Sequence, residues 1–264
     1  MPKTIALAGK GGVGKTTVAG MIIKYLAQSQ PGSILAIDAD PSSNLNMVLG
    51  LDLEWTVGDI REDMLQQVKT SLVEGGAAMG GLPGGISKRE YLDYHVRTAL
   101  AEGARFDLIA MGRSEGSGCY CAVNHNLREV VDSLSRHYAY VVIDNEAGME
   151  HLSRHTTRDV QDLIIVSDPT QRGLVAAQRI AQLRKELDIN VENVYLLVNR
   201  VPGGELPDQL KAFIDMIDVP LLGTIAANSD LSAFEFSGKP LVDLGDESPV
   251  YQSVKEMMEK IGLV

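Results

Sequence analysis

The chain has few cysteines and few basic residues, and it has no long apolar run. Its two cysteines, Cys119 and Cys121, are too few for the disulfide framework of a small secreted protein. No apolar run approaches the roughly 20 residues of a membrane span, and the N-terminus does not resemble a signal peptide. Lys and Arg number 24 against 35 Asp and Glu, a net charge of −11, which disfavours nucleic acid or an anionic membrane as partner. We therefore expect a cytoplasmic protein.

The apolar residues of the 264-residue chain are arranged as short runs separated by helical patterns. Continuous apolar strands that alternate with helices predict βαβ units and an α/β fold, a doubly wound, mostly parallel sheet flanked by helices. We expect one domain over residues 1–264. The predicted strands are Thr4–Ala8, Ser33–Ile37, Phe106–Met111, Tyr140–Ile143, Leu163–Val166, Val194–Val198 and Leu221–Ile225. The predicted helices are Lys15–Ala27, Lys88–Ala101, Asn126–His137, Leu174–Leu187, Pro207–Met216 and Pro249–Ile261.

Residues Gly9–Thr17 read GKGGVGKTT, between a predicted strand and a predicted helix. This is the P-loop pattern, in which glycines let several backbone N–H groups point at an anion beside a helix N-terminus. Lys15 would reach the β- and γ-phosphates of ATP, and the Thr16 hydroxyl would ligate Mg²⁺. The predicted nucleotide-binding residues of this loop are Gly11, Gly12, Val13, Gly14, Lys15, Thr16 and Thr17.

Lys10 is a second lysine inside the loop, which an ordinary P-loop does not need. Its side chain is either exposed to solvent or catalytic. If two chains meet face to face, Lys10 can reach the partner's nucleotide, as a lysine version of an arginine finger.

Polar residues follow several predicted strands, where α/β sheets bind ligands. Asp38 and Asp40 follow the second strand, and one could orient the attacking water while the other supports Mg²⁺. Asp144 follows four apolar residues, a Walker B pattern, and Asn145–Glu150 is a candidate switch that responds to the γ-phosphate. Asn199 has an amide that fits the adenine edge, although asparagine after a strand is also a common turn residue.

Cys119 and Cys121 form a C-x-C pair, which is either two buried thiols or half of a metal site. Two chains related by a two-fold axis would bring four thiolates together, and these can hold Zn²⁺, Ni²⁺ or an iron–sulfur cluster. His125 and the pair His151 and His155 are weaker metal-ligand candidates.

Together, GKGGVGKTT, DADP at 38–41, DNEAGMEH at 144–151 and LVNR at 197–200 resemble the deviant Walker A ATPases of the MinD/ParA/nitrogenase iron protein class. With GCYC at 118–121, the chain resembles the CooC-type accessory ATPases that insert nickel into carbon monoxide dehydrogenase, and their relatives that serve acetyl-CoA synthase. The resemblance implies a homodimer with two ATP molecules and one Ni²⁺ or Zn²⁺ between the C-x-C motifs. It assigns Lys10 a role across the dimer, Asp40 the water-activating position and Asp144 the Walker B position.

Two alternatives remain open. A spatial organiser of the MinD or ParA type would need a basic membrane-binding helix or a basic DNA-binding surface, which the charge of −11 opposes. An iron–sulfur electron donor like the nitrogenase iron protein would use two widely separated cysteines. The stretch 52–103, including the glycine-rich segment Gly75–Gly85, carries no recognisable motif.

Overall fold

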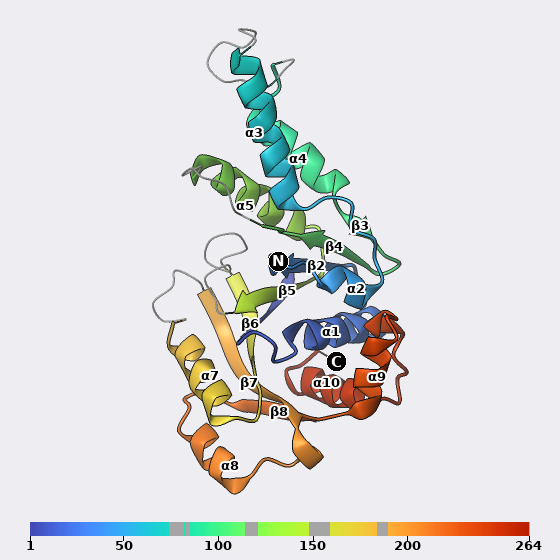
Figure 1. Ribbon diagram of the computed structural model, residues 1–264, viewed down its shortest axis with the longest axis vertical. Helices are drawn as coiled ribbons and strands as arrows, with labels where there is room; N and C mark the ends of the chain where they lie inside the picture. Colours follow the sequence, from blue (N-terminus) through green and yellow to red (C-terminus); the bar gives the residue numbers. More distant parts are fainter. Residues whose placement is uncertain (74–81, 83–84, 114–120, 148–158, 184–189, 264) are drawn as a thin grey trace.

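The computed structural model describes residues 1–73, 82, 85–113, 121–147, 159–183 and 190–263. Its centre is an eight-stranded sheet with the order β3-β4-β2-β5-β1-β6-β7-β8 (Figure 1). The strands are β1 Lys3–Gly9, β2 Ile34–Ala39, β3 Ala101–Glu102, β4 Phe106–Ala110, β5 Tyr140–Ala147, β6 Asp159–Ser167, β7 Asn190–Val201 and β8 Leu221–Ala226. The predicted parallel sheet is confirmed. The exception is the short edge strand β3, which pairs antiparallel with β4 and was not predicted.

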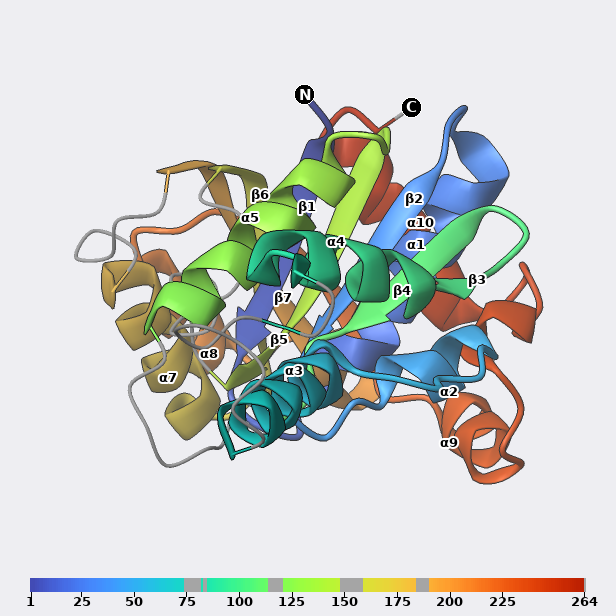
Figure 2. The same cartoon turned by 90° about the horizontal axis from the view of Figure 1, so that it is seen from above.

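Helices cover both faces of this sheet, as Figures 1 and 2 show. They are α1 Lys15–Ser29, α2 Leu45–Leu49, α3 Val57–Val73, α4 Lys88–Thr98, α5 Cys121–Ser135, α7 Gln171–Leu183, α8 Asp208–Asp215, α9 Ser229–Phe236 and α10 Pro249–Lys260. Two short 3₁₀ helices are also present, η2 Pro202–Gly204 after β7 and η3 Leu241–Asp243 after α9. Among the described residues, no helix has the length and apolar character needed to cross a membrane.

The core follows from the alternation of side chains along each strand. In β1, Ile5 and Leu7 join the apolar cluster beneath α1 and α10. Their neighbours Ala6 and Ala8 join the opposite cluster, which includes side chains of α3, α4, α5 and α7. Both faces of the central strands are therefore buried, which explains why these strands read as unbroken apolar runs.

The helix α3 was missed by the sequence prediction, although it carries a start signal. The Thr56 hydroxyl accepts a hydrogen bond from the Asp59 backbone N–H at 3.1 Å, and the Asp59 carboxylate accepts from the Thr56 N–H at 2.8 Å. This reciprocal arrangement is a capping box with Asp in place of Glu. Both α3 and α4 extend away from the sheet at the top of Figure 1.

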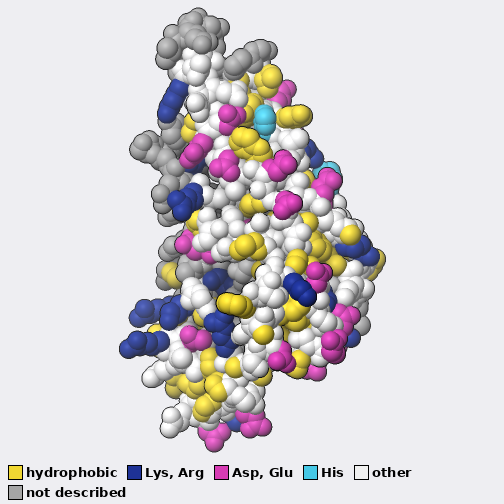
Figure 3. All heavy atoms as spheres, turned by 45° about the vertical axis from the view of Figure 1, so that its right-hand side comes forward, with side chains coloured by type: hydrophobic (Ala, Val, Ile, Leu, Met, Phe, Trp, Pro, Cys, Tyr) yellow, Lys and Arg dark blue, Asp and Glu magenta, His cyan; other side chains and the backbone are white. Residues whose placement is uncertain are grey.

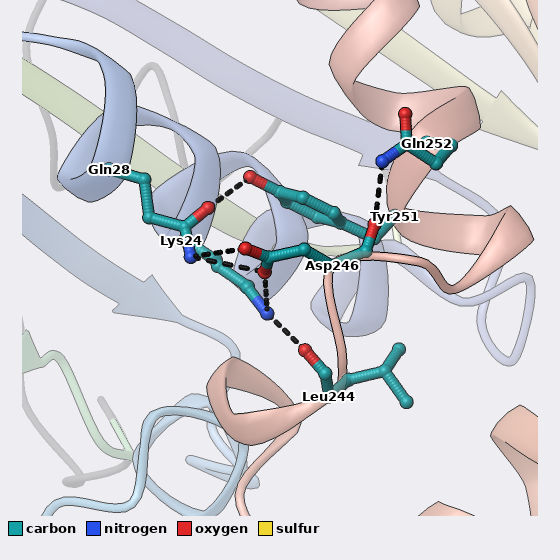
Figure 4. Close-up of polar contacts among 6 residues, drawn as sticks. All are labelled: Lys24, Gln28, Leu244, Asp246, Tyr251 and Gln252. Atoms are coloured by element: carbon teal, nitrogen blue, oxygen red, sulfur yellow. Dashed lines mark hydrogen bonds and ion pairs between the residues drawn. The ribbon is translucent and has the colours of Figure 1, made fainter.

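A buried lysine joins α1 to the segment that precedes α10 (Figure 4). The Lys24 ammonium donates a hydrogen bond to the Leu244 carbonyl, lies 2.8 Å from Asp246 Oδ1, and stands 4.7 Å from the centre of the Tyr251 ring. The Lys24 side chain is only 6% exposed, whereas that of Asp246 is 63% exposed. Because α1 begins at the P-loop, this cluster also anchors the helix that supports the loop.

We predict that Lys24→Met lowers the free energy of unfolding by about 1–3 kcal/mol, because the buried Leu244 carbonyl loses its donor. Lys211→Met is the matched control, since Lys211 is 57% exposed and forms an ion pair with Asp208 on the same helix. It should change stability by less than about 0.5 kcal/mol. Denaturant unfolding of both variants measures the difference, and equal effects would contradict the anchoring role of Lys24.

Candidate functional site

The carboxyl ends of β1, β2 and β5 meet at one edge of the sheet. In the parallel register, Asp38 of β2 lies opposite Asp144 of β5, and Asp144 lies opposite Leu7 of β1. The Asn145 amide adds a cross-strand hydrogen bond of 2.7 Å to the Leu7 carbonyl. The structure therefore brings two predicted site carboxylates to the same level, next to the loop that leaves β1.

That loop curls because two of its glycines adopt left-handed backbone conformations. Gly12 has φ 79° and Gly14 has φ 93°, a region that L side chains rarely occupy. A Cβ atom on Gly14 would also lie 2.4 Å from the Asn199 amide nitrogen. Lys15 then begins α1, and its buried ammonium donates to the Lys10 carbonyl at 3.3 Å. The Lys10 side chain itself is exposed.

Burial of Asp144, which is 1% exposed, raises the pKa of its carboxyl to about 7. A hydrogen bond with Thr16 and the charge of Lys15 act in the opposite direction, while the nearby charge of Asp38 raises the pKa further. Within the described part of the chain, Asp144 Oδ1 is buried without a hydrogen-bond partner. A divalent cation at Thr16 and Asp144 would supply the positive charge that this oxygen lacks.

Asp38 shapes the loop that follows β2. Its carboxylate accepts hydrogen bonds from the backbone N–H of Leu45 at 2.9 Å and of Asp40 at 3.0 Å. Burial nevertheless raises its pKa to about 6. Asp40 is more exposed, and its own carboxylate accepts from the Ser42 N–H at 2.8 Å. Asp40 lines the cavity over the P-loop, and its water-activating role stays a prediction.

Asn199 is placed against the P-loop. Its amide donates to the Val13 carbonyl at 2.8 Å, and its oxygen accepts from the Arg200 backbone N–H at 2.8 Å. Arg200, at φ 58°, donates from its guanidinium to the Gly12 carbonyl at 2.9 Å. These contacts give Asn199 a structural task that was not predicted, and its role in adenine recognition stays a prediction.

A cavity of about 830 Å³ opens over the P-loop, with Lys15, Thr16, Asp40 and Glu146 among its lining residues. A neighbouring hollow of about 500 Å³ lies between Asn199 and the start of α9. The two hollows share Thr17, Arg200 and Glu235 in their linings. Their combined extent suits the phosphates of a nucleotide on one side and its nucleoside on the other.

Glu235 and the surrounding segment were missed from the sequence. The Thr17 hydroxyl donates to the Glu235 carboxylate at 2.9 Å, which places α9 directly over the P-loop. A start signal was present, because the Asn228 side chain caps α9 by accepting from the Leu231 N–H at 2.7 Å. Nothing in the local pattern, however, indicates that this helix returns to a loop 218 residues earlier.

Several predicted metal ligands lie outside the described residues, namely Cys119, His151, His155 and the side chains of Cys121 and His125. Cys121 is the first residue of α5, and this helix begins five residues earlier than predicted. The glycine-rich segment and the residues 148–150 of the candidate switch also lie almost wholly outside. Among the side chains that the structure does describe, no group of three or more His, Cys, Asp or Glu residues is arranged to hold a metal.

A parallel α/β sheet with a P-loop, a buried carboxylate at the end of a neighbouring strand and a cavity over the loop define a P-loop nucleoside triphosphatase. Sequence comparison refines this class. The profile of the CobQ/CobB/MinD/ParA nucleotide binding domain matches residues 4–241, so the chain belongs to this family and is an ATPase of the MinD/ParA class.

Two curated relatives align over nearly their whole length. The chain is 40% identical to an uncharacterised ATP-binding protein of Methanocaldococcus jannaschii, over 97% of both chains. It is 28% identical to the carbon monoxide dehydrogenase accessory protein CooC of Rhodospirillum rubrum, over 98% of this chain and 97% of the relative. Among solved structures, the septum site-determining protein MinD of Pyrococcus horikoshii, complexed with Mg-ADP, has the same fold. It has a TM-score of 0.68 at 22% identity and covers 99% of this chain and 96% of that one.

ATP and Mg²⁺ fit the described residues. The left-handed glycines leave backbone N–H groups for the phosphates, and Lys15 and the N-terminus of α1 supply positive charge. Thr16 and Asp144 would hold Mg²⁺, with Asp144 acting through the water shell of the ion. The bound ion would neutralise charge that develops on the phosphates during hydrolysis.

We predict that Asp144→Asn stabilises the nucleotide-free protein, and more so at pH 8 than at pH 5. The folded-state pKa of about 7 lies above the ordinary value of 3.8, so the wild type loses stability as pH rises between these values. The advantage of the variant should grow by up to about 3 kcal/mol between pH 5 and pH 8. Denaturant unfolding at both pH values measures it.

The same variant should lose Mg²⁺-dependent ATP hydrolysis, because the amide cannot supply the negative charge that Mg²⁺ requires. A stability advantage that is independent of pH would contradict the raised pKa. Wild-type turnover would contradict the assignment of Asp144 to the magnesium site.

Proposed function

We propose that this protein is an ATP-driven nickel metallochaperone that matures carbon monoxide dehydrogenase or acetyl-CoA synthase. The observation that carries the proposal is a full-length similarity to CooC in a chain whose two cysteines form a C-x-C pair. Thiolates bind nickel and zinc well, and a nucleotide hydrolase supplies a cycle for loading and release.

The metal and the nucleotide act through one homodimer in this proposal. Cys119 and Cys121 of the two chains hold one Ni²⁺ or Zn²⁺ between them, and each chain binds one ATP. ATP favours the closed dimer and brings the thiolate pairs together, while hydrolysis relaxes them. By linkage, if ATP tightens metal binding, the metal tightens ATP binding by the same factor.

A spatial organiser is the competing candidate, because MinD proteins are also among the relatives, for example that of Synechocystis at 26% identity over 90% of this chain. Two observations favour the metallochaperone. The apolar side of α10 is committed to the core, with Val254, Met257 and Met258 buried, so this helix does not present an apolar face to a membrane. A spatial organiser also gives the C-x-C pair no task.

We predict one Ni²⁺ or Zn²⁺ per dimer when either ion is titrated into the reduced protein. A non-hydrolysable ATP analogue should increase the affinity of the protein for the metal ion, measured by calorimetry, and the fraction of dimer, measured by light scattering. Cys119→Ser and Cys121→Ser should each lose the metal and retain nucleotide binding. Metal binding that survives both substitutions would contradict the shared site. Iron and sulfide in anaerobically purified protein would instead favour the electron donor.

The dimer proposal also assigns Lys10 and Asp40 to opposite sides of each ATP, with Lys10 supplied by the partner chain. We predict that Lys10→Ala and Asp40→Ala each lose ATP hydrolysis and still bind nucleotide. An equal mixture of the two variants should recover up to about a quarter of wild-type turnover, because half of the dimers then contain one complete site. No recovery would place Lys10 at its own nucleotide, and an active Asp40→Ala would contradict the water-activating role.

A further inference from the structure

A further pocket lies between α3 and α4. Its volume is about 400 Å³, and Trp55, Tyr91, Tyr94 and His95 contribute rings to its lining. Trp55 is the single tryptophan of the chain. Trp55 is 50% exposed and Tyr94 is 64% exposed, so two large aromatic side chains stand in contact with water. On the face seen in Figure 3, a histidine lies among hydrophobic and acidic side chains at the level of these helices.

The rings of α4 form a connected set. The His95 ring lies 4.1 Å from the Tyr91 ring, centre to centre, and 5.2 Å from the Tyr94 ring in an edge-on arrangement. The Tyr91 side chain is held by two hydrogen bonds of its hydroxyl, which donates to the Asp63 carboxylate and accepts from the Gln67 amide at 3.0 Å. Burial and Asp63 raise the pKa of Tyr91 to about 12, so the phenol stays neutral. The Tyr91 ring, which forms one wall of the pocket, is therefore held in place without a ligand.

The charge of the pocket has one sign. Glu54 and Asp63 line it, and none of the described lining residues is Lys or Arg. Aromatic faces attract cations through the ring quadrupole, and a nearby carboxylate adds direct attraction. Asp63 is already engaged by Tyr91 and Gln67, whereas Glu54 is exposed at the rim and is the carboxylate that an incoming cation meets.

We propose that this pocket binds an arginine side chain presented by a partner protein. A guanidinium is flat enough to stack on Trp55 or Tyr94 and can donate two hydrogen bonds to the Glu54 carboxylate. Helices α3 and α4, which supply most of the lining, extend beyond the sheet (Figure 1). The pocket is also close to the ATPase site in sequence, because Asp52 lines the nucleotide cavity and Glu54 lines this pocket.

The single tryptophan makes the proposal testable in the intact protein. The probe is N-acetyl-arginine amide, titrated while Trp55 fluorescence is followed, and N-acetyl-citrulline amide is its uncharged isostere. We expect a saturable change with the arginine probe, which weakens as salt is raised, and none with the citrulline probe. Glu54→Gln should weaken binding by about two- to fivefold, as expected for an exposed ion pair.

Glu62→Gln is the matched control, because Glu62 is an exposed carboxylate of α3 outside the lining of the pocket. Tyr94→Ala, at an exposed position, tests the aromatic contribution without disturbing the core. The proposal is overturned if the arginine probe gives no saturable change, if citrulline binds equally well, or if Glu62→Gln weakens binding as much as Glu54→Gln. Normal ATP hydrolysis in Glu54→Gln would confirm that the pocket is separate from the ATPase site.

Discussion

The site depends on the parallel register of β1, β2 and β5. Backbone hydrogen bonds fix the height at which each strand ends, so Asp38 and Asp144 face each other beside the loop that leaves β1. Two carboxylates buried together are unfavourable in the absence of a cation, and burial raises the pKa of both. The sheet can hold this arrangement because its apolar core lies on both faces. A divalent cation bound beside them would offset the free-energy cost of burying these charges.

The P-loop is supported from several distant parts of the chain. Asn199 and Arg200 from the end of β7 hold the carbonyls of Val13 and Gly12, and Glu235 from α9 contacts Thr17. The Lys24 cluster anchors the other half of α1 to the segment before α10. Loop and helix are thus fixed from three sides, which favours phosphate binding by a preorganised set of N–H groups.

The segment after Asp40 links the nucleotide cavity to the aromatic pocket between α3 and α4. The Asp38 carboxylate holds the N-terminus of α2, and α2 leads through Asp52 and Glu54 into α3. A change at the nucleotide therefore has a short covalent route to the aromatic pocket. In an ATPase that serves another protein, such a route would let the nucleotide state influence the contact with the partner.

The P-loop, the parallel α/β fold and the carboxylates at the strand ends could be predicted from the sequence, because each depends on local spacing and on the period of apolar residues. Seven of the strands were found in this way, whereas α3 and α9 were missed despite their caps at Thr56 and Asn228. Which remote residues contact the P-loop could not be predicted and is seen in the folded chain alone. The contacts of Asn199, Arg200 and Glu235, and the pocket that Trp55 lines together with residues of α4, join residues that are far apart in the chain. No local pattern encodes such contacts, since they arise from the order of the strands and the packing of helices on the sheet.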